Sequence, residues 1–332
     1  MRRLIAEFEE QSFTQIIFPH AATDWNAYLR EAEECFVNII TTVARFQKCL
    51  VICDDIEAVQ QHFSEHKNLI FVHYTTNDTW ARDCSALCVS DDATTKLLNF
   101  TFNGWGEKFV ADKDNALSHA LAKCYAKKLE DIDFVLEGGA VESNGRDTLL
   151  TTAECMLNPN RNPKCNNIQI TQKLKSCFGA AHILYLNHGY LAGDDTDSHI
   201  DTLARFINED TIMYVSCDNR DDEHFHQLQL MQEELQMIAD ERGLKLIALP
   251  LPDALYFEGE RLPATYVNFL FVNGAVLVPT YNVTQDKAAL AIFKKTFPNR
   301  EIVGIDSSVL IRQHGSLHCV SMNFAADIRL SC

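Results

Sequence analysis

The chain has 332 residues, of which 47% are hydrophobic and 23% are charged, a composition typical of a globular protein with a large core. Its 29 basic and 46 acidic side chains give a net charge of −17, which disfavours nucleic acid and anionic lipid as partners and favours cationic ligands. No run approaches the ~18 apolar residues of a membrane span, and Glu7, Glu9 and Glu10 interrupt any signal-peptide core, so we expect neither.

The first quarter of the chain combines strand-like apolar runs with one long helical pattern. Thr23 and Asp24 provide a cap for this helix, in which apolar residues recur at helical spacing. The predicted elements are strands at Phe13–Pro19, Cys49–Cys53 and Leu69–His73, the long helix at Trp25–Gln47 and a short helix at Ile56–Phe63.

After residue 80 one pattern recurs four times: a hairpin of two strands, then a helix, then a further strand. Asn144-Gly145 and Asn273-Gly274 are strong turn signals for two of the hairpins. The blocks are Cys84–Val89, Leu97–Phe102, Asp114–Lys128 and Phe134–Leu136; Ala140–Glu142, Thr148–Thr151, Ile170–Phe178 and His182–Leu186; Ile200–Phe206, Ile212–Ser216, Glu223–Asp240 and Leu244–Leu249; and Tyr266–Val272, Ala275–Pro279, Gln285–Phe297 and Ile302–Ile305.

This repeat, with a period of roughly 50 to 65 residues, indicates a radial or solenoid architecture. A fifth block forms if a tail strand at Leu317–Asn323 pairs with the first strand, at Phe13–Phe18. Closing a ring with the two ends of the chain removes exposed sheet edges. The sequence therefore predicts one α/β domain over residues 1–332, built as a closed five-bladed α/β propeller. A plain α+β or α/β domain is the alternative.

Five polar residues are candidates for chemistry: Cys319, His199, Glu137, Asp83 and Asp201. A nucleophilic cysteine needs a histidine that the fold, and not sequence proximity, brings to it. In a closed ring, equivalent strand ends converge on the axis, so residues between positions 83 and 319 can share one pocket. A thiol, an imidazole and three carboxylates together suggest a thiol enzyme that acts on a positively charged group.

Eight segments carry a resemblance to a known family. They are Asn77–Asp83, Asn103–Gly106, Leu136–Ala140, Thr151–Cys155, Asn160–Pro163, Gly193–Asp201, Leu262–Phe269 and Gly315–Cys319. In these segments, and in their order along the chain, the sequence resembles the agmatine deiminases of the bacterial peptidylarginine deiminase family, within the pentein superfamily of guanidino-group-modifying proteins. The resemblance extends from roughly residue 77 to 323 and implies the pentein fold.

The resemblance also implies a role for each candidate residue. Cys319 becomes the nucleophile, His199 the general acid and base, and Glu137 the carboxylate beside the substrate and the histidine. Asp83 and Asp201 grip the guanidinium, whose forked N–H donors suit two carboxylates. Trp80 is implied to lie near the guanidinium. The nearby acids should raise the pKa of Cys319, so that the incoming cation helps to form its own nucleophile.

The implied reaction is hydrolysis of agmatine to N-carbamoylputrescine and ammonia through a covalent thiouronium, with no metal or organic cofactor. Its product belongs to putrescine and polyamine biosynthesis. For the distal ammonium of agmatine, Asp195 is the candidate partner and Trp105 a candidate wall. Free arginine would need a cation for its α-carboxylate, for which Arg205 and Arg161 are available, and peptidyl-arginine would need an open cleft.

Departures from the family pattern leave loop shape and substrate range open. Asp83-Cys84-Ser85-Ala86 stands where the family usually has Asp-x-Gly-Pro, and Ser321-Met322-Asn323 replaces its usual glutamines. A non-catalytic binding protein of the same fold is a further hypothesis. It predicts that some of the five candidate catalytic residues have been replaced. A papain-like hydrolase has no need of three further acids.

Five of the other cysteines are interpreted as structural, and we expect no metal site. None of the 12 cysteines forms a C-x-x-C pair, and we expect reduced thiols in a cytoplasmic protein. A zinc site is disfavoured, because His199, Asp201 and Cys319 are dispersed and because His224 and His226 open an acidic helix. Assembly into a homo-oligomer is left open. The cysteines interpreted as structural are Cys84, Cys88, Cys155, Cys217 and Cys332.

Overall fold

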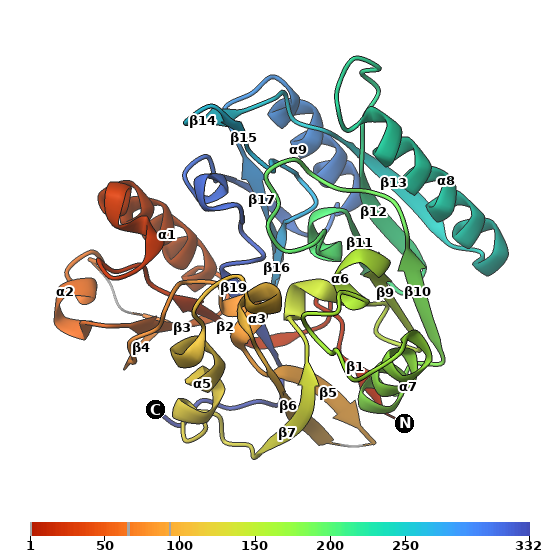
Figure 1. The fold of residues 1–332 in the computed structure, drawn as a ribbon. Helices are drawn as coiled ribbons and strands as arrows, with labels where there is room; N and C mark the ends of the chain where they lie inside the picture. The colour runs from red at the N-terminus through yellow and green to blue at the C-terminus, as the bar shows by residue number, and fades with distance from the viewer. Residues whose placement is uncertain (1, 65–66, 93) are drawn as a thin grey trace.

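The computed structural model describes residues 2–64, 67–92 and 94–332 and contains five sheets built on the same plan (Figure 1). In each, an antiparallel pair of strands is followed by a parallel third strand. The five trios are β5-β6-β7, β8-β9-β10, β11-β12-β13, β16-β17-β18 and β19-β2-β3. The repeated unit that the sequence predicts is therefore confirmed. Within the described ranges no sheet closes on itself, so the fold is a mixed α/β fold with separate sheets.

The two ends of the chain share one sheet. β19 (Ser321–Ala325) pairs antiparallel with β2 (Gln11–Ile17), which runs parallel to β3 (Lys48–Cys53), and β4 (Leu69–His73) completes the sheet. The predicted pairing of the tail with the first strand is confirmed. The helices of this unit are η1 (Asp24–Tyr28), α1 (Leu29–Ala44) and α2 (Ile56–Gln60).

The other four units follow along the chain. The first contains β1 (Arg3–Leu4), α3 (Ala81–Cys84), β5 (Leu87–Asp91), β6 (Thr94–Thr101), α4 (Gly104–Glu107), α5 (Asp112–Ala120) and β7 (Leu129–Val135). The second contains η2 (Gly138–Ala140), β8 (Glu142–Ser143), β9 (Thr148–Thr152), α6 (Ala153–Met156), α7 (Asn167–Phe178) and β10 (His182–Leu186). The third contains η3 (Ile200–Thr202), β11 (Ala204–Asn208), β12 (Thr211–Ser216), α8 (Phe225–Arg242) and β13 (Lys245–Pro250). The fourth contains β14 (Tyr256–Phe257), β15 (Glu260–Arg261), β16 (Leu270–Val272), β17 (Ala275–Thr280), α9 (Gln285–Thr296), β18 (Glu301–Asp306) and η4 (Leu310–Gln313).

Several predicted boundaries are wrong. The strand expected at Tyr266–Val272 begins at Leu270, and the one expected at Cys84–Val89 begins at Leu87, after the short helix α3. The helix expected at Asp114–Lys128 ends at Ala120, and β7 begins at Leu129 instead of Phe134, because acidic residues on its exposed positions obscure the strand pattern. Ile200 begins a short 3-10 helix and not a strand. The tail strand begins at Ser321 instead of Leu317, because residues 317–320 form a hydrogen-bonded turn.

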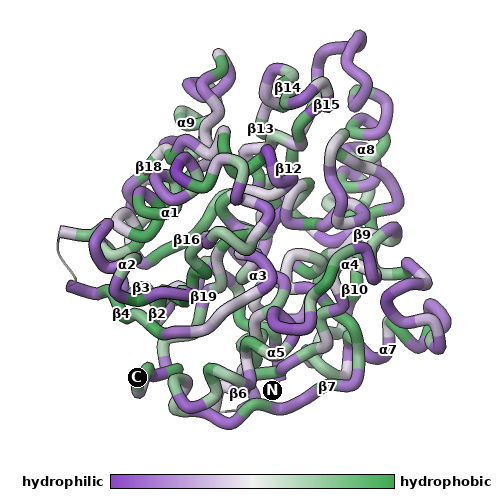
Figure 2. Tube along the Cα trace, turned by 60° about the vertical axis from the view of Figure 1, so that its left-hand side comes forward, coloured by the Kyte–Doolittle hydropathy of each residue, from purple (hydrophilic) through white to green (hydrophobic). Residues whose placement is uncertain are grey.

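Buried side chains of the sheets and helices form two apolar clusters. One is formed mainly by the closing unit and the first two units, for example Phe13 and Leu97, and includes Leu277 of the fourth unit. The other is formed mainly by the third and fourth units, for example Leu228 and Phe293, and includes strand residues of the second unit. In Figure 1, α1, α7 and α8 lie toward the outside, and Figure 2 shows hydrophilic residues along the outer loops. No described helix is long and apolar enough to cross a membrane.

Short segments at strand ends meet near the middle of the molecule. Helix α3 contacts η2 and β19, and η2 contacts η3. These segments hold residues 81–84, 138–140 and 200–202, together with the turn that precedes β19. The topology therefore gathers the ends of several units into one place.

Candidate active site

A cavity of about 390 Å³ brings most of the predicted site residues together. Its lining includes Asp83, His199, Asp201 and Cys319, and also Trp80, Trp105 and Asp195. These residues come from the first unit, the third unit and the turn before β19. Glu137 does not line the cavity, and its position is described below.

Asp83 is fixed by donors on both oxygens. Its Oδ1 accepts a hydrogen bond from the Gly139 backbone N–H (2.9 Å), and its Oδ2 accepts one from Trp105 Nε1 (2.9 Å). Burial, reinforced by the charge of Asp201, raises the pKa of Asp83, although His199 and the two donors oppose this rise. The carboxylate is therefore oriented before any ligand arrives.

Asp201 lies across the site, and its two oxygens have different surroundings. Oδ2 accepts a hydrogen bond from His318 Nδ1 (2.6 Å), whereas Oδ1 is buried and has no hydrogen-bond partner in the described part of the chain. Burial would raise the pKa of Asp201, but the hydrogen bond and charge of His318, with the charge of His199, outweigh it and hold the pKa below its ordinary value. Asp201 is thus an ionised group with one unused acceptor.

His199 immediately precedes η3 and is 1% exposed. Its Nδ1 lies 3.8 Å from Asp83 Oδ1, and its Nε2 is buried without a hydrogen-bond partner among the described residues. Burial would lower the pKa of His199, but Asp83, Cys155 and Glu137 together raise it well above its usual value. The imidazole is therefore protonated near neutral pH and can donate a proton.

Cys319 lies in the turn that leads into β19. Its Sγ is 3.4 Å from Asn268 Oδ1 and 3.9 Å from Asp201 Oδ2. Burial, with the charges of Asp201 and Asp83, raises the pKa of the Cys319 thiol well above its usual value. This direction agrees with the sequence-based expectation, and it means that the thiol is protonated in the cavity as it stands.

The close surroundings of Gly139 explain why a glycine is required at this position, two residues after Glu137. A Cβ at Gly139 would lie 2.7 Å from His199 Nδ1 and 3.0 Å from carboxylate oxygens of both Asp83 and Asp201. No side chain larger than hydrogen fits without displacing one of these groups. The glycine therefore allows the histidine and the two carboxylates to approach one another.

Glu137 lies behind His199 and not on the cavity surface. Both of its oxygens accept hydrogen bonds from Arg161 Nε (2.9 and 3.0 Å), and Arg161 Nη1 also donates to Asp197 (2.6 Å). Ligand atoms of Glu137, Cys155 and His199 lie within 4.8 Å of one another. The prediction that Glu137 lies beside the histidine agrees with this geometry, but the structure gives it no direct exposure to a ligand.

Sequence reasoning missed several residues of this arrangement, among them Cys155 and His318. Cys155 was interpreted as structural, yet its thiol lies against His199, and His318 received no role although it binds Asp201. The only available signals were the place of Cys155 within a family-like segment and the adjacency of His318 to Cys319. Neither signal gives the side-chain partner.

The two arginines considered for an α-carboxylate are engaged elsewhere. Arg161 pairs with Glu137 and Asp197, and Arg205, which is fully buried, pairs with Glu7 and Glu142. Neither lines the cavity, and no described lining residue is a lysine or an arginine. The lining instead contains seven aspartates: Asp24, Asp78, Asp83, Asp114, Asp194, Asp195 and Asp201.

Asp195 belongs to the loop that closes one side of the cavity. Lys108 holds this loop by donating to the Asp195 carbonyl (2.6 Å) and to Asp197 Oδ1 (2.8 Å). Burial, reinforced by Asp194, raises the pKa of Asp195 to about 6. The Trp80 ring forms a wall at another side, so close to Gly315 that a Cβ there would lie 2.1 Å from it.

Comparison with known proteins agrees with the family resemblance. The family model of Porphyromonas-type peptidyl-arginine deiminase matches residues 3–324. The agmatine deiminase of Pseudomonas aeruginosa (strain UCBPP-PA14) is 28% identical, over 96% of this chain and 94% of that protein. The chain therefore belongs to the Porphyromonas-type peptidyl-arginine deiminase family.

Solved structures show the same fold. A Cys-to-Ser variant of C. jejuni agmatine deiminase with substrate bound is 42% identical, with a TM-score of 0.93 over 98% of this chain and 96% of that one. The putative arginine deiminase from Porphyromonas gingivalis is also 42% identical, with a TM-score of 0.95 over 99% of this chain and 100% of that one. The agmatine deiminase of Enterococcus faecalis has a TM-score of 0.90 at 25% identity, and covers 97% of this chain and 95% of that one.

Proposed function

We propose that this member of the peptidyl-arginine deiminase family hydrolyses agmatine to N-carbamoylputrescine and ammonia. The observation that carries the proposal is the cavity itself. It places a thiol and a protonated imidazole beside two oriented carboxylates, and its described lining contains seven aspartates but no lysine or arginine. Such a cavity suits a ligand that is cationic at both ends, as agmatine is. The agmatine deiminases among its relatives support the same substrate.

In the proposed complex the guanidinium lies between Asp83 and Asp201. Asp201 Oδ1 is an acceptor without a partner in the described structure, and a guanidinium N–H satisfies it. The two carboxylates fix the plane of the cation, so that its central carbon faces the sulfur of Cys319. Asp195 pairs with the distal ammonium, and Trp80 and Trp105 form walls of the site.

The reaction then proceeds in two stages. Binding of the cation lowers the pKa of the Cys319 thiol, and the thiol proton leaves to solvent. The thiolate forms a C–S bond to the guanidinium carbon, and protonated His199 gives its proton to the departing nitrogen, so that the C–N bond breaks and ammonia leaves. An S-alkylthiouronium remains. His199 then takes a proton from water as the water adds to the same carbon, and cleavage of the C–S bond releases the ureido product and the thiolate. The remaining proton leaves with ammonia as ammonium.

Agmatine is favoured over free arginine because the cavity offers no described cation for an α-carboxylate. Arg161 and Arg205 are each held between two carboxylates, so neither can turn into the cavity without leaving a buried charge unpaired. An α-carboxylate would also face the acidic lining. Arginine is therefore expected to bind poorly.

The test compares agmatine, free arginine and a peptidyl-arginine as substrates, with ureido product and ammonia both measured. Agmatine alone should be turned over, and Cys319→Ala should be inactive. Turnover of arginine or peptidyl-arginine instead would show that this compound, and not agmatine, is the substrate. Absence of turnover with all three would favour a binding protein. Activity of Cys319→Ala on agmatine would disprove the covalent mechanism.

We further propose that the five units form one domain arranged as a closed five-bladed propeller around the cavity. The contacts of β19 with β5 and of β11 with β8 support side-by-side packing of successive units. Asn273 exchanges hydrogen bonds with the backbone of Gln11, which links the fourth unit to the closing one (3.0 and 2.7 Å). The 12 cysteines are all described and all unpaired, which supports the cytoplasm as the location.

A further inference from the structure

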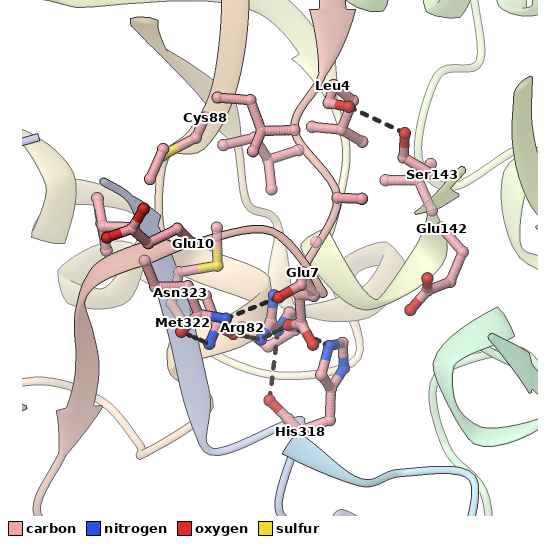
Figure 3. A pocket seen from close by; sticks show the side chains of 18 residues that line it. Leu4, Glu7, Glu10, Arg82, Cys88, Glu142, Ser143, His318, Met322 and Asn323 are labelled. Carbon is pink, nitrogen blue, oxygen red and sulfur yellow. Dashed lines mark hydrogen bonds and ion pairs between the residues drawn. The ribbon is translucent and has the colours of Figure 1, made fainter. Parts of the chain in front are cut away.

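The side of Asp201 that faces away from the cavity is held by a chain of charged groups. His318 Nδ1 bonds to Asp201 Oδ2 (2.6 Å), and His318 Nε2 bonds to Glu7 Oε1 (2.7 Å). Figure 3 shows Glu7 directly beside the His318 ring. Because an ionised carboxylate only accepts hydrogen bonds, both ring nitrogens must donate, and His318 is an imidazolium.

Glu7 is itself fixed as an anion by the groups around it. Arg205 Nη2 donates to its Oε2 (2.5 Å), and Arg82 forms an ion pair with its Oε1. Burial would raise the pKa of Glu7, but the charges of Arg82, His318 and Arg205 outweigh it and hold the pKa well below its usual value. Its side chain is only 12% exposed, so this charge lies in the interior and at close range to His318.

Glu7 comes from the segment before β2, 311 positions before His318, and sequence analysis gave it no role. We propose that Glu7 is a positioning residue for the guanidinium: it keeps His318 protonated on both ring nitrogens, and His318 then holds Asp201 with its Oδ1 directed at the substrate. The inference rests on the proposed function, in which Asp201 binds the guanidinium. Without a charge at Glu7, His318 can lose its Nε2 proton, and the neutral imidazole then holds Asp201 through a weaker, uncharged Nδ1–H donor.

The first test is the isosteric change Glu7→Gln, assayed on agmatine. We expect kcat/KM to fall by about 10- to 100-fold, mainly through a higher KM. A loss of this size is typical when a group that orients a directly binding residue is removed. Glu142→Gln is the matched control, because Glu142 is also buried and binds Arg205 but makes no hydrogen bond to His318. The control should lose stability but keep the wild-type KM.

The second test restores the missing charge. Glu7 and His318 line a cavity of about 60 Å³ on this side of the site, so Glu7→Ala leaves room for a small carboxylate. Added formate should recover part of the activity of Glu7→Ala, whereas equal chloride should not. Wild-type kinetics in folded Glu7→Gln, or a KM increase of the same size in Glu142→Gln, would overturn the inference.

The third test does not depend on turnover. In protein labelled with ¹⁵N-histidine, His318 should show two protonated ring nitrogens, assigned by their loss in His318→Gln. Glu7→Gln should lose one of these protons, and an unchanged spectrum would overturn the inference. If the wild-type protein does not hydrolyse agmatine, the proposed function is wrong. The spectrum would still show whether Glu7 keeps His318 protonated. Should Glu7→Gln not fold, Glu7→Ala without added formate takes its place in both measurements.

Discussion

The hydrogen bond from Trp105 to Asp83 offers a direct test of how the guanidinium site is organised. Trp105→Phe keeps an aromatic ring against Phe102 and Phe109, whose centroids lie 4.9 and 5.6 Å from the Trp105 ring, but it deletes the indole N–H. Asp83 Oδ2 then loses the donor at 2.9 Å while remaining buried. Asp83 becomes both less oriented and harder to ionise.

The size of the effect follows from the loss of one hydrogen bond to a charged group. Such a bond contributes about 1.5–3 kcal/mol, which corresponds to a fall in kcat/KM for agmatine of roughly 10- to 150-fold at 25 °C. The pH profile provides a second readout. Trp105 lowers the pKa of Asp83, so its removal raises that pKa further. Only the ionised form grips the cation, and this form is lost as the pH falls through the pKa, so the acid limb of kcat/KM should move to higher pH.

The assay measures kcat/KM for agmatine between acidic and neutral pH, with Trp25→Phe as the matched control. Trp25 Nε1 also donates to an aspartate that lines the cavity, Asp78 (3.0 Å), but it makes no hydrogen bond to Asp83. The control should cost stability and leave the acid limb in place. A folded Trp105→Phe with the wild-type kcat/KM and the wild-type acid limb would refute the assignment of Asp83 to the guanidinium.

Three further substitutions test neighbouring features. Gly139→Ala should lower kcat/KM by at least ~100-fold, because its Cβ would press on His199 Nδ1 at 2.7 Å and displace it. Cys155→Ala removes a group that raises the pKa of His199, so the basic limb of kcat/KM, where protonated His199 is lost, should move to lower pH. Arg161→Ala leaves Glu137 buried without its partner and should lower the free energy of unfolding by about 3–5 kcal/mol, measured by denaturant titration.

Each of these substitutions has a control of the same type elsewhere in the chain. Gly304→Ala in β18, Cys177→Ala in α7 and the exposed Arg146→Ala should leave agmatine kinetics unchanged, and Arg146→Ala should change stability little. Full activity of Gly139→Ala, an unmoved basic limb in Cys155→Ala, or wild-type stability of Arg161→Ala would contradict the respective argument.

Local sequence patterns were sufficient for the repeated unit of the fold. Hairpin turns such as Asn273-Gly274, followed by amphipathic helices and apolar strands, place nearly every element within a few residues of its observed position. The exceptions are segments in which tertiary contacts override local pattern. Strand β7 carries acids at its exposed positions, and the turn at residues 317–320 has the alternation of a strand but is fixed by its own hydrogen bonds.

Only the site residues that lie within the family-like segments could be predicted from the sequence. Asp83, His199, Asp201 and Cys319 lie in such segments, and the structure brings them to one cavity. The partners that control their charge cannot be read from sequence, because each pairing joins distant positions. Glu7 and His318, for example, are 311 positions apart, and their contact depends on how the first and last units meet.

The electrostatics of the cavity connect substrate binding to the chemical step. The thiol of Cys319 is protonated because it is buried and because Asp201 and Asp83 lie nearby, so the protein without substrate holds a weak nucleophile. A cation placed ~4 Å from the sulfur stabilises the thiolate by about 4 kcal/mol at an effective dielectric constant of 20, and this attraction lowers the pKa of the thiol. A neutral amide of the same shape supplies no such charge. In the proposed reaction, therefore, the same aspartates that bind the guanidinium also restrict catalysis to cationic substrates, because only a cation reverses their effect on Cys319.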